Sequence, residues 1–233
     1  MIFAGLQPCS LIDYPGVIAS TIFTQGCPFR CVYCHNPELI PVCTSDPDQP
    51  QKEEHVLEQL YQRRRIIEGV CITGGEPTIH ADLPDFIKKV KRLGLLVKLD
   101  TNGIHPNMIE RLIKDQLVDF FAMDLKHTWE HYSDVIGIDQ SSAVNSCKNT
   151  FHLIQDSAIP HEFRTTVYSG LHGQEDLKAI ASQLRPGERY ALQDIRYGTT
   201  LNPILTRTPS LDLKKIADEI QTLYPMLHLE VRS

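Results

Sequence analysis

The sequence lacks several features that would place the protein in a membrane, on nucleic acid or outside the cell. No apolar run is long enough to span a membrane, and the start has no basic segment leading into an apolar one, as a signal peptide does. Basic charge is also scarce, because 23 Lys and Arg stand against 29 Asp and Glu, so no surface for nucleic acid is expected. Seven cysteines without a secretory signal fit a reducing compartment and metal ligation better than disulfides. We therefore expect a cytoplasmic protein with no membrane or nucleic acid partner.

Apolar runs alternate with amphipathic stretches along the chain. In residues 83–93 the apolar side chains recur at spacings of three and four, which predicts a helix with one buried face. Repeating this pattern gives six strand–helix units. We expect strands at Val17–Thr24, Gly69–Thr73, Leu95–Asp100, Val118–Asp124, His161–Tyr168 and Arg189–Arg196, and helices that start near Glu53, Leu83, Pro106, Ser141, Gln174 and Leu211.

Strands that alternate with helices predict a parallel sheet, and six such units are two short of a closed eight-stranded barrel. We expect an α/β fold, a partial (β/α)6 TIM-like barrel over residues 17–224 that is open on one side. An N-terminal hairpin over residues 1–16 precedes it, and a C-terminal strand within residues 225–233 follows. No segment reads as a linker between domains, so residues 1–233 are expected to form one domain. Residues 41–54 are the longest irregular piece and are expected to be a surface loop.

Three cysteines stand within eight residues, directly after the first predicted strand: Cys27, Cys31 and Cys34. Thiolates are soft ligands, and three of them leave one metal position free. The spacing favours an open [4Fe–4S] cluster. A zinc ion with His35 as fourth ligand, redox-active thiols, and unrelated structural cysteines remain alternatives. The spacing of three and then two residues resembles the cysteine motif of the radical S-adenosylmethionine (radical SAM) enzymes.

Unusual residues also follow the other predicted strands, at the end where the active sites of such barrels lie. The second strand ends in Gly74-Gly75-Glu76-Pro77, whose glycines allow close approach of backbone to a ligand. Asp100 and Asp124 end the next two strands, Lys126 follows, and Arg164 lies within the fifth. Charges so placed need partners. They form either structural ion pairs or a binding site for charged groups of a ligand.

The order of these motifs, from Cys34-His35-Asn36-Pro37 to Asp100-Thr101-Asn102-Gly103 and Arg164-Thr165-Thr166-Val167, is similar to that in the activases of glycyl radical enzymes. Within them it most resembles the activating proteins of anaerobic ribonucleoside-triphosphate reductase, in the form that carries Ser10-Leu11-Ile12-Asp13-Tyr14-Pro15-Gly16 before the first strand. The resemblance runs over nearly the whole chain. It implies that Cys27, Cys31 and Cys34 ligate three irons and that S-adenosylmethionine (SAM) binds the fourth. The cluster would then split SAM into methionine and a 5′-deoxyadenosyl radical.

The same resemblance implies roles for the other site residues. Tyr33 would lie against the adenine of SAM, and Gly74, Gly75 and Glu76 would meet its amino group. Asp124 and Lys126 would face the ribose or carboxylate, and Arg164 the carboxylate. Asp100 and Asp124 would also hold a monovalent cation.

The implied activity is abstraction of a hydrogen atom from a glycine of a partner enzyme, anaerobic ribonucleotide reductase, with flavodoxin or ferredoxin as electron donor. Two alternatives remain open. The chain could activate another glycyl radical enzyme such as a formate lyase, or it could act on a small molecule, as deazaguanine-forming radical SAM enzymes do. Cys9, Cys43, Cys71 and Cys147 are isolated, so no second cluster is expected. Cys9 is expected to be half-buried and Cys71 to be an inert core thiol.

Overall fold

The computed structural model describes residues 1–42, 52–138, 141–197, 200–202, 205 and 209–232. Within them, eight strands form one sheet and lie in it in chain order. The strands are β1 (Phe3–Ser10), β2 (Ala19–Thr24), β3 (Gly69–Gly74), β4 (Leu96–Thr101), β5 (Phe120–Asp124), β6 (His161–Val167), β7 (Arg189–Asp194) and β8 (His228–Arg232). The α-helices are α1 (Glu53–Arg63), α2 (Leu83–Arg92), α3 (Pro106–Lys114), α4 (Tyr132–Ile136), α5 (Ser141–Asp156), α6 (Gln174–Ala181) and α7 (Leu213–Leu223).

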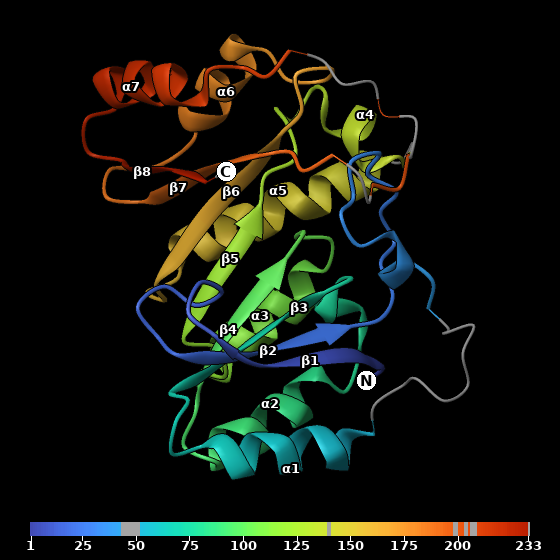
Figure 1. Ribbon diagram of the computed structural model, residues 1–233. Coiled ribbons are helices and arrows are strands. Elements are labelled where there is room, and N and C mark those ends of the chain that lie inside the picture. Colours follow the sequence, from blue (N-terminus) through green and yellow to red (C-terminus); the bar gives the residue numbers. More distant parts are fainter. Residues whose placement is uncertain (43–51, 139–140, 198–199, 203–204, 206–208, 233) are drawn as a thin grey trace.

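The sheet is open, with β1 and β8 at its two edges. Strands β2 to β8 are parallel, whereas β1 runs antiparallel to β2 and pairs Phe3 with Thr24 and Leu6 with Ile22. Helices α1 and α2 lie beyond the β1–β3 side of the sheet, and α6 and α7 lie beyond the β7–β8 side (Figure 1). Six strands, β2 to β7, are each followed by a helix. The predicted α/β fold of six βα units, open on one side, is therefore confirmed. Residues 1–16 hold one strand, β1, which forms its hairpin with β2, and β8 lies within the segment 225–233.

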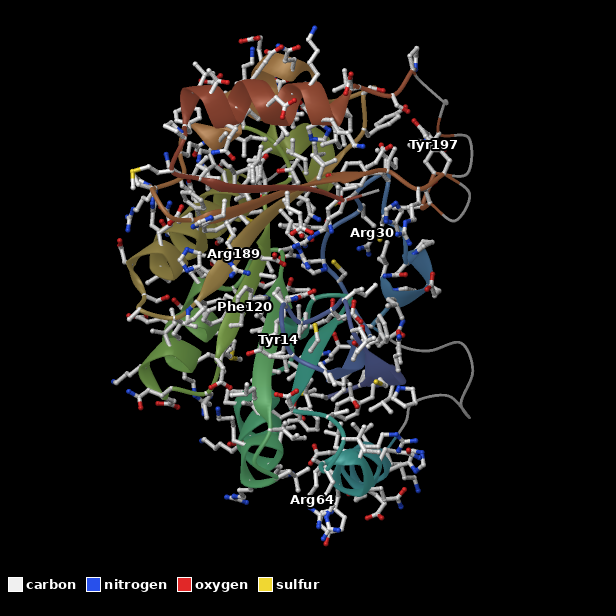
Figure 2. The ribbon with its side chains drawn as sticks, turned by 60° about the vertical axis from the view of Figure 1, so that its left-hand side comes forward. Tyr14, Arg30, Arg64, Phe120, Arg189 and Tyr197 are labelled. Atoms are coloured by element: carbon white, nitrogen blue, oxygen red, sulfur yellow. The ribbon has the colours of Figure 1, made fainter. Side chains whose placement is uncertain are left out.

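The core lies between the sheet and the helices. Leu83, Phe86, Ile87 and Val90 of α2 are fully buried, as their spacing predicts. In the hairpin, Tyr14 packs against Phe120 at the start of β5, with ring centroids 5.8 Å apart (Figure 2). Burial of these apolar side chains is the main source of the fold's stability. Among the described residues, no helix is both long and apolar enough to cross a membrane.

Some sequence predictions need correction. Cys9 is exposed instead of half-buried, because it lies in the edge strand β1, which has a neighbour on only one side. Helix α4 was not predicted; it has only five residues and ends at Gly137, whose φ of 65° is left-handed. Several strand ends shift by one or two residues, as for β2, which starts at Ala19 instead of Val17. Most of the expected surface loop, including Cys43, lies outside the described residues.

Candidate functional site

A cavity of about 410 Å³ lies at the carboxyl ends of the parallel strands. All eleven residues singled out from the sequence line it: Cys27, Cys31, Tyr33, Cys34, Gly74, Gly75, Glu76, Asp100, Asp124, Lys126 and Arg164. They come from segments spread over more than half of the chain, and the parallel strands bring them together because those strands end at one edge of the sheet. The cavity is therefore the candidate functional site.

The cysteine loop, residues 25–42, is held by backbone hydrogen bonds at both ends. Gly26 N donates to Leu39 O at 2.7 Å, and Cys27 N donates to Ile40 O at 3.0 Å. On the other side of the loop, Arg30 N donates to Ile136 O at 2.8 Å, at the end of the unpredicted helix α4. These bonds fix the path of the loop before any metal binds.

The three thiols differ in their surroundings. Cys31 is buried, and Cys27 and Cys34 are partly buried. Burial raises the pKa of the Cys27 thiol to about 12 and that of the Cys31 thiol to about 11, so metal binding would release their protons. No three Cys, His, Asp or Glu side chains of the described residues are arranged to hold a single metal ion. Zinc needs such an arrangement, but a cluster does not, since each thiolate binds a different iron.

His35, the proposed fourth zinc ligand, accepts a hydrogen bond at Nε2 from the backbone N–H of Arg196, at 3.2 Å. The segment after β7 also reaches the cysteine loop through Leu201 N, which donates to Cys34 O at 3.0 Å. In Figure 2, Arg30 of the loop and Tyr197 of this segment lie on the same side of the molecule. The segment after β7 thus supports the cysteine loop, a contact that the sequence did not indicate.

Gly74 and Gly75 let the end of β3 approach the cysteine loop. A Cβ on Gly75 would lie 2.1 Å from the carbonyl oxygen of Gly26, and one on Gly74 would lie 2.4 Å from the backbone nitrogen of Thr24. Gly74 also has a φ of 109°, which residues with a Cβ rarely adopt. Glycine is therefore required at these two positions because the end of β3 packs closely against the backbone of residues 24–26, whether or not a ligand is bound.

Glu76 is fully buried and its carboxylate is well supplied with donors. Oε1 accepts hydrogen bonds from the backbone N–H and hydroxyl of Thr78 and from the hydroxyl of Thr101, and Oε2 accepts from the backbone N–H of Asn102 at 2.6 Å. Burial raises the pKa of Glu76 in spite of these bonds. The residue ties β3 to β4 at the cavity wall.

Charged side chains form one network across the strand ends. Arg164 donates from Nη1 to Asp100 at 3.0 Å and from Nε to Asp124 at 2.9 Å, so its guanidinium bridges the two carboxylates. Lys126 donates to Asp124 at 2.9 Å, and the buried Lys98 donates to Asp100. Burial raises the pKa of both aspartates, but the adjacent cations outweigh it and hold each pKa below its usual range. Three cations face two carboxylates, which leaves one positive charge to attract an anionic group.

The ammonium of Lys98 belongs to this network although the sequence reasoning missed it. Lys98 is 1% exposed and stands two residues before Asp100, on the same face of β4. A lysine inside an otherwise apolar strand was the signal that could have revealed it. Asn102 was also missed as a site residue; it lines the cavity, and its Nδ2 lies 3.7 Å from the Cys27 sulfur.

Tyr33 is 3% exposed, and its ring centroid lies 6.2 Å from that of the buried His172. Among the described residues, its buried hydroxyl has no hydrogen-bond partner. Because buried polar groups are nearly always paired, a molecule bound in the cavity is one source of the missing partner.

A sequence model of the radical SAM superfamily matches residues 21–184. A protein of Methanocaldococcus jannaschii, named provisionally as a glycyl-radical enzyme activating enzyme, is 30% identical over 195 residues, or 82% of this chain and 78% of that protein. Pyruvate formate-lyase 1-activating enzyme of Escherichia coli K12 is 26% identical over 153 residues, or 62% of this chain and 60% of that enzyme.

Solved structures agree on the fold at low identity. SuiB of Streptococcus suis superimposes with a TM-score of 0.68 at 13% identity, over 91% of this chain and 48% of SuiB. The structure titled anSMEcpe with bound AdoMet gives a TM-score of 0.63 at 15% identity, over 89% of this chain and 62% of that one. The chain thus spans about half the length of SuiB and less than two thirds of several other relatives.

Proposed function

This chain belongs to the radical SAM superfamily, and we propose that it is the activating enzyme of a glycyl radical enzyme. Enzymes of the superfamily use a [4Fe–4S] cluster and SAM. The observation that carries the proposal is the convergence of all eleven sequence-selected residues on one cavity at the strand ends. The names of the curated relatives support the same activity.

The cysteine loop fits a cluster with one open iron. We propose that Cys27, Cys31 and Cys34 hold three irons, since all three thiols line the same cavity. The hydrogen bond from Arg196 to His35 engages Nε2 of that imidazole, which further weakens the zinc alternative. The backbone hydrogen bonds of the loop hold these ligands in place.

The cavity wall fits the charged and polar ends of SAM. Lys126 and Arg164 belong to the charge network whose surplus positive charge would attract the SAM carboxylate. We propose that Glu76 and the Gly74-Gly75 backbone, which line the same cavity, hold the SAM amino group. Tyr33 would contact the adenine. When bound, the cluster and SAM supply a 5′-deoxyadenosyl radical, and the residues named here orient SAM and exclude water.

The substrate that we propose is a glycine of a protein partner, anaerobic ribonucleotide reductase. Abstraction of a hydrogen atom from this glycine would yield 5′-deoxyadenosine and a glycyl radical. The open sheet supports a protein substrate, because β1 and β8 do not close the barrel around the cavity. Pyruvate formate-lyase is the alternative partner, since it appears in the name of the Escherichia coli relative.

We also propose that residues 1–233 act as one radical SAM domain, with flavodoxin or ferredoxin as electron donor. A cytoplasmic location fits the free thiols of the described cysteines. A monovalent cation between Asp100 and Asp124 stays a prediction. The Arg164 guanidinium bridges the same two carboxylates, so a cation would compete with it for their negative charge.

Reductive cleavage of SAM tests the enzyme class. Anaerobically reconstituted protein with SAM and a strong reductant should yield 5′-deoxyadenosine, and a Cys31→Ala variant should not. Equal yields from both proteins would mean that the chain carries a cluster without using it on SAM.

A further inference from the structure

Asn102 lies against a cysteine of the loop in a way that its position in the sequence does not reveal. The residue follows β4 and is 7% exposed, and its side-chain Nδ2 lies 3.7 Å from Sγ of Cys27. This distance is within hydrogen-bond range for sulfur, which is a larger atom than oxygen.

The orientation of the Asn102 amide follows from its other partner. Its Oδ1 accepts a hydrogen bond from the backbone N–H of Ile104 at 3.0 Å. Reversing the amide would place two N–H donors against each other at Ile104 and would turn a carbonyl oxygen towards the Cys27 sulfur. The Nδ2 group therefore faces Cys27.

The backbone around Asn102 is fixed by buried partners. Its N–H donates to Glu76 at 2.6 Å, and its carbonyl oxygen accepts from the Cys147 thiol at 3.3 Å. The next carbonyl, that of Gly103, accepts from the hydroxyl of Thr150 at 2.7 Å. With its backbone held on both sides, the side chain has little freedom to turn away from Cys27.

We propose that Asn102 is a positioning residue whose amide donates an N–H···S hydrogen bond to the Cys27 thiolate and thereby raises the reduction potential of the cluster. The inference rests on the proposed role of Cys27 as a cluster ligand. A donor at a ligand sulfur stabilises the reduced cluster, which carries one more negative charge, over the oxidised one. Asn102 would thus make the cluster easier to reduce by a low-potential electron donor.

The test compares the wild type with three variants, each reconstituted anaerobically with iron and sulfide. Asn102→Asp keeps an oxygen for the Ile104 N–H but removes the donor and adds a negative charge beside Cys27. Asn102→Ala removes donor and acceptor together. Asn107→Ala, which removes an exposed asparagine from α3, is the matched control.

The readout is the midpoint potential of the cluster without SAM, from a redox titration followed by electron paramagnetic resonance. Both Asn102 variants should have a more negative potential than the wild type, with Asn102→Asp shifted further, and Asn107→Ala should match the wild type. Wild-type potentials in both Asn102 variants would overturn the proposal and leave Asn102 as a residue that only closes the turn after β4. If Asn102→Ala does not fold, the potential of Asn102→Asp decides in the same way.

This readout is separate from the activase reaction. A shifted potential without any glycyl radical on a partner would sustain the role of Asn102 and count against the proposed activity. Unshifted potentials together with a glycyl radical on the partner would support the proposed activity and contradict the role of Asn102.

Discussion

The carboxylate of Glu76 accepts a hydrogen bond from the backbone N–H of Asn102 at 2.6 Å, and this bond joins the end of β3 to the end of β4. Glu76 follows the two glycines that bring β3 against the cysteine loop. The same residue therefore links the loop side of the cavity to the side that carries Asp100. We expect the shape of the cavity to depend on it before any ligand is bound.

Replacement of Glu76 by Ala should destabilise the fold strongly. Donors of Thr78, Thr101 and Asn102 would lose their acceptor in a buried place, and each such loss costs roughly 1–3 kcal/mol. We expect the free energy of unfolding, from urea titrations of the unreconstituted protein, to fall by about 3–5 kcal/mol. Glu110→Ala, on the exposed side of α3, should change it by about 0.5 kcal/mol or less. Equal losses in the two variants would contradict this role of Glu76.

Arg164→Ala should create a binding site for a monovalent cation. Without the guanidinium, no group bridges Asp100 and Asp124, and removing one partner of a buried ion pair costs about 3–5 kcal/mol. A potassium ion could replace part of the missing charge. The melting temperature of the variant should therefore rise more with potassium than with tetramethylammonium chloride, and this difference should be smaller in the wild type, where Arg164 already neutralises the two carboxylates. Equal responses in the variant would mean that the two carboxylates do not form a cation site.

The cluster should depend on the three loop cysteines and on no other. Wild-type protein reconstituted anaerobically should hold about four irons and four sulfides, and Ala at Cys27, Cys31 or Cys34 should abolish the cluster absorbance. Cys9→Ala is the control, because Cys9 is exposed and lies outside the cavity lining. Cys43→Ala should also leave the cluster intact. Stoichiometric zinc without sulfide would contradict the assignment.

The pair His161–Glu188 lies outside the cavity lining and should make the free energy of unfolding depend on pH. Burial lowers the pKa of His161, but the hydrogen bond with Glu188 at 3.4 Å and that to Ile159 O outweigh it, so the pKa lies above its usual value of 6.5. The folded protein thus binds this proton more tightly than the unfolded chain does. The resulting stabilisation is complete below pH 6.5 and is lost as the pH rises through the raised pKa.

Urea unfolding of the wild type and His161→Gln at about pH 5.5 and about pH 8.5 checks this dependence. The stability difference between the two proteins should be larger at the lower pH. His131→Gln, which removes an exposed histidine that also faces a carboxylate, is the control. The same difference for His161→Gln at both pH values would contradict the prediction.

Much of the fold could be predicted because hydrophobic periodicity specifies it locally. The apolar face of α2 and the short apolar strand β3 are visible in the sequence, and their alternation dictates a parallel sheet. Helix α4 was missed, since five residues carry too little periodicity to be recognised. Cys9 was misplaced because exposure depends on which strand forms the edge of the sheet, and one sequence does not state this.

The residues of the candidate site could be predicted from motifs, whereas their contacts could not. Spacing selects Cys27 and its neighbours, but the pairing of Arg164 with both Asp100 and Asp124 follows from the register of β4, β5 and β6. Lys98 lies only two residues before Asp100, so the lysine inside an apolar strand was a local signal for its role. The contact of Asn102 with Cys27, like the two ion pairs of Arg164, joins segments that are distant in the chain, and no local pattern records it.

Transfer of a radical to a protein glycine tests the proposed activity most directly. Reconstituted protein, SAM and a strong reductant are mixed anaerobically with anaerobic ribonucleotide reductase, and in parallel with pyruvate formate-lyase, and electron paramagnetic resonance spectra are recorded. We predict the doublet of a glycyl radical on the reductase, with 5′-deoxyadenosine formed alongside it and neither product with Cys31→Ala. A doublet on the lyase alone would support the proposed activase activity but show that pyruvate formate-lyase, not the reductase, is the partner. Turnover of SAM with a small molecule, without a doublet on either enzyme, would contradict the proposed activity.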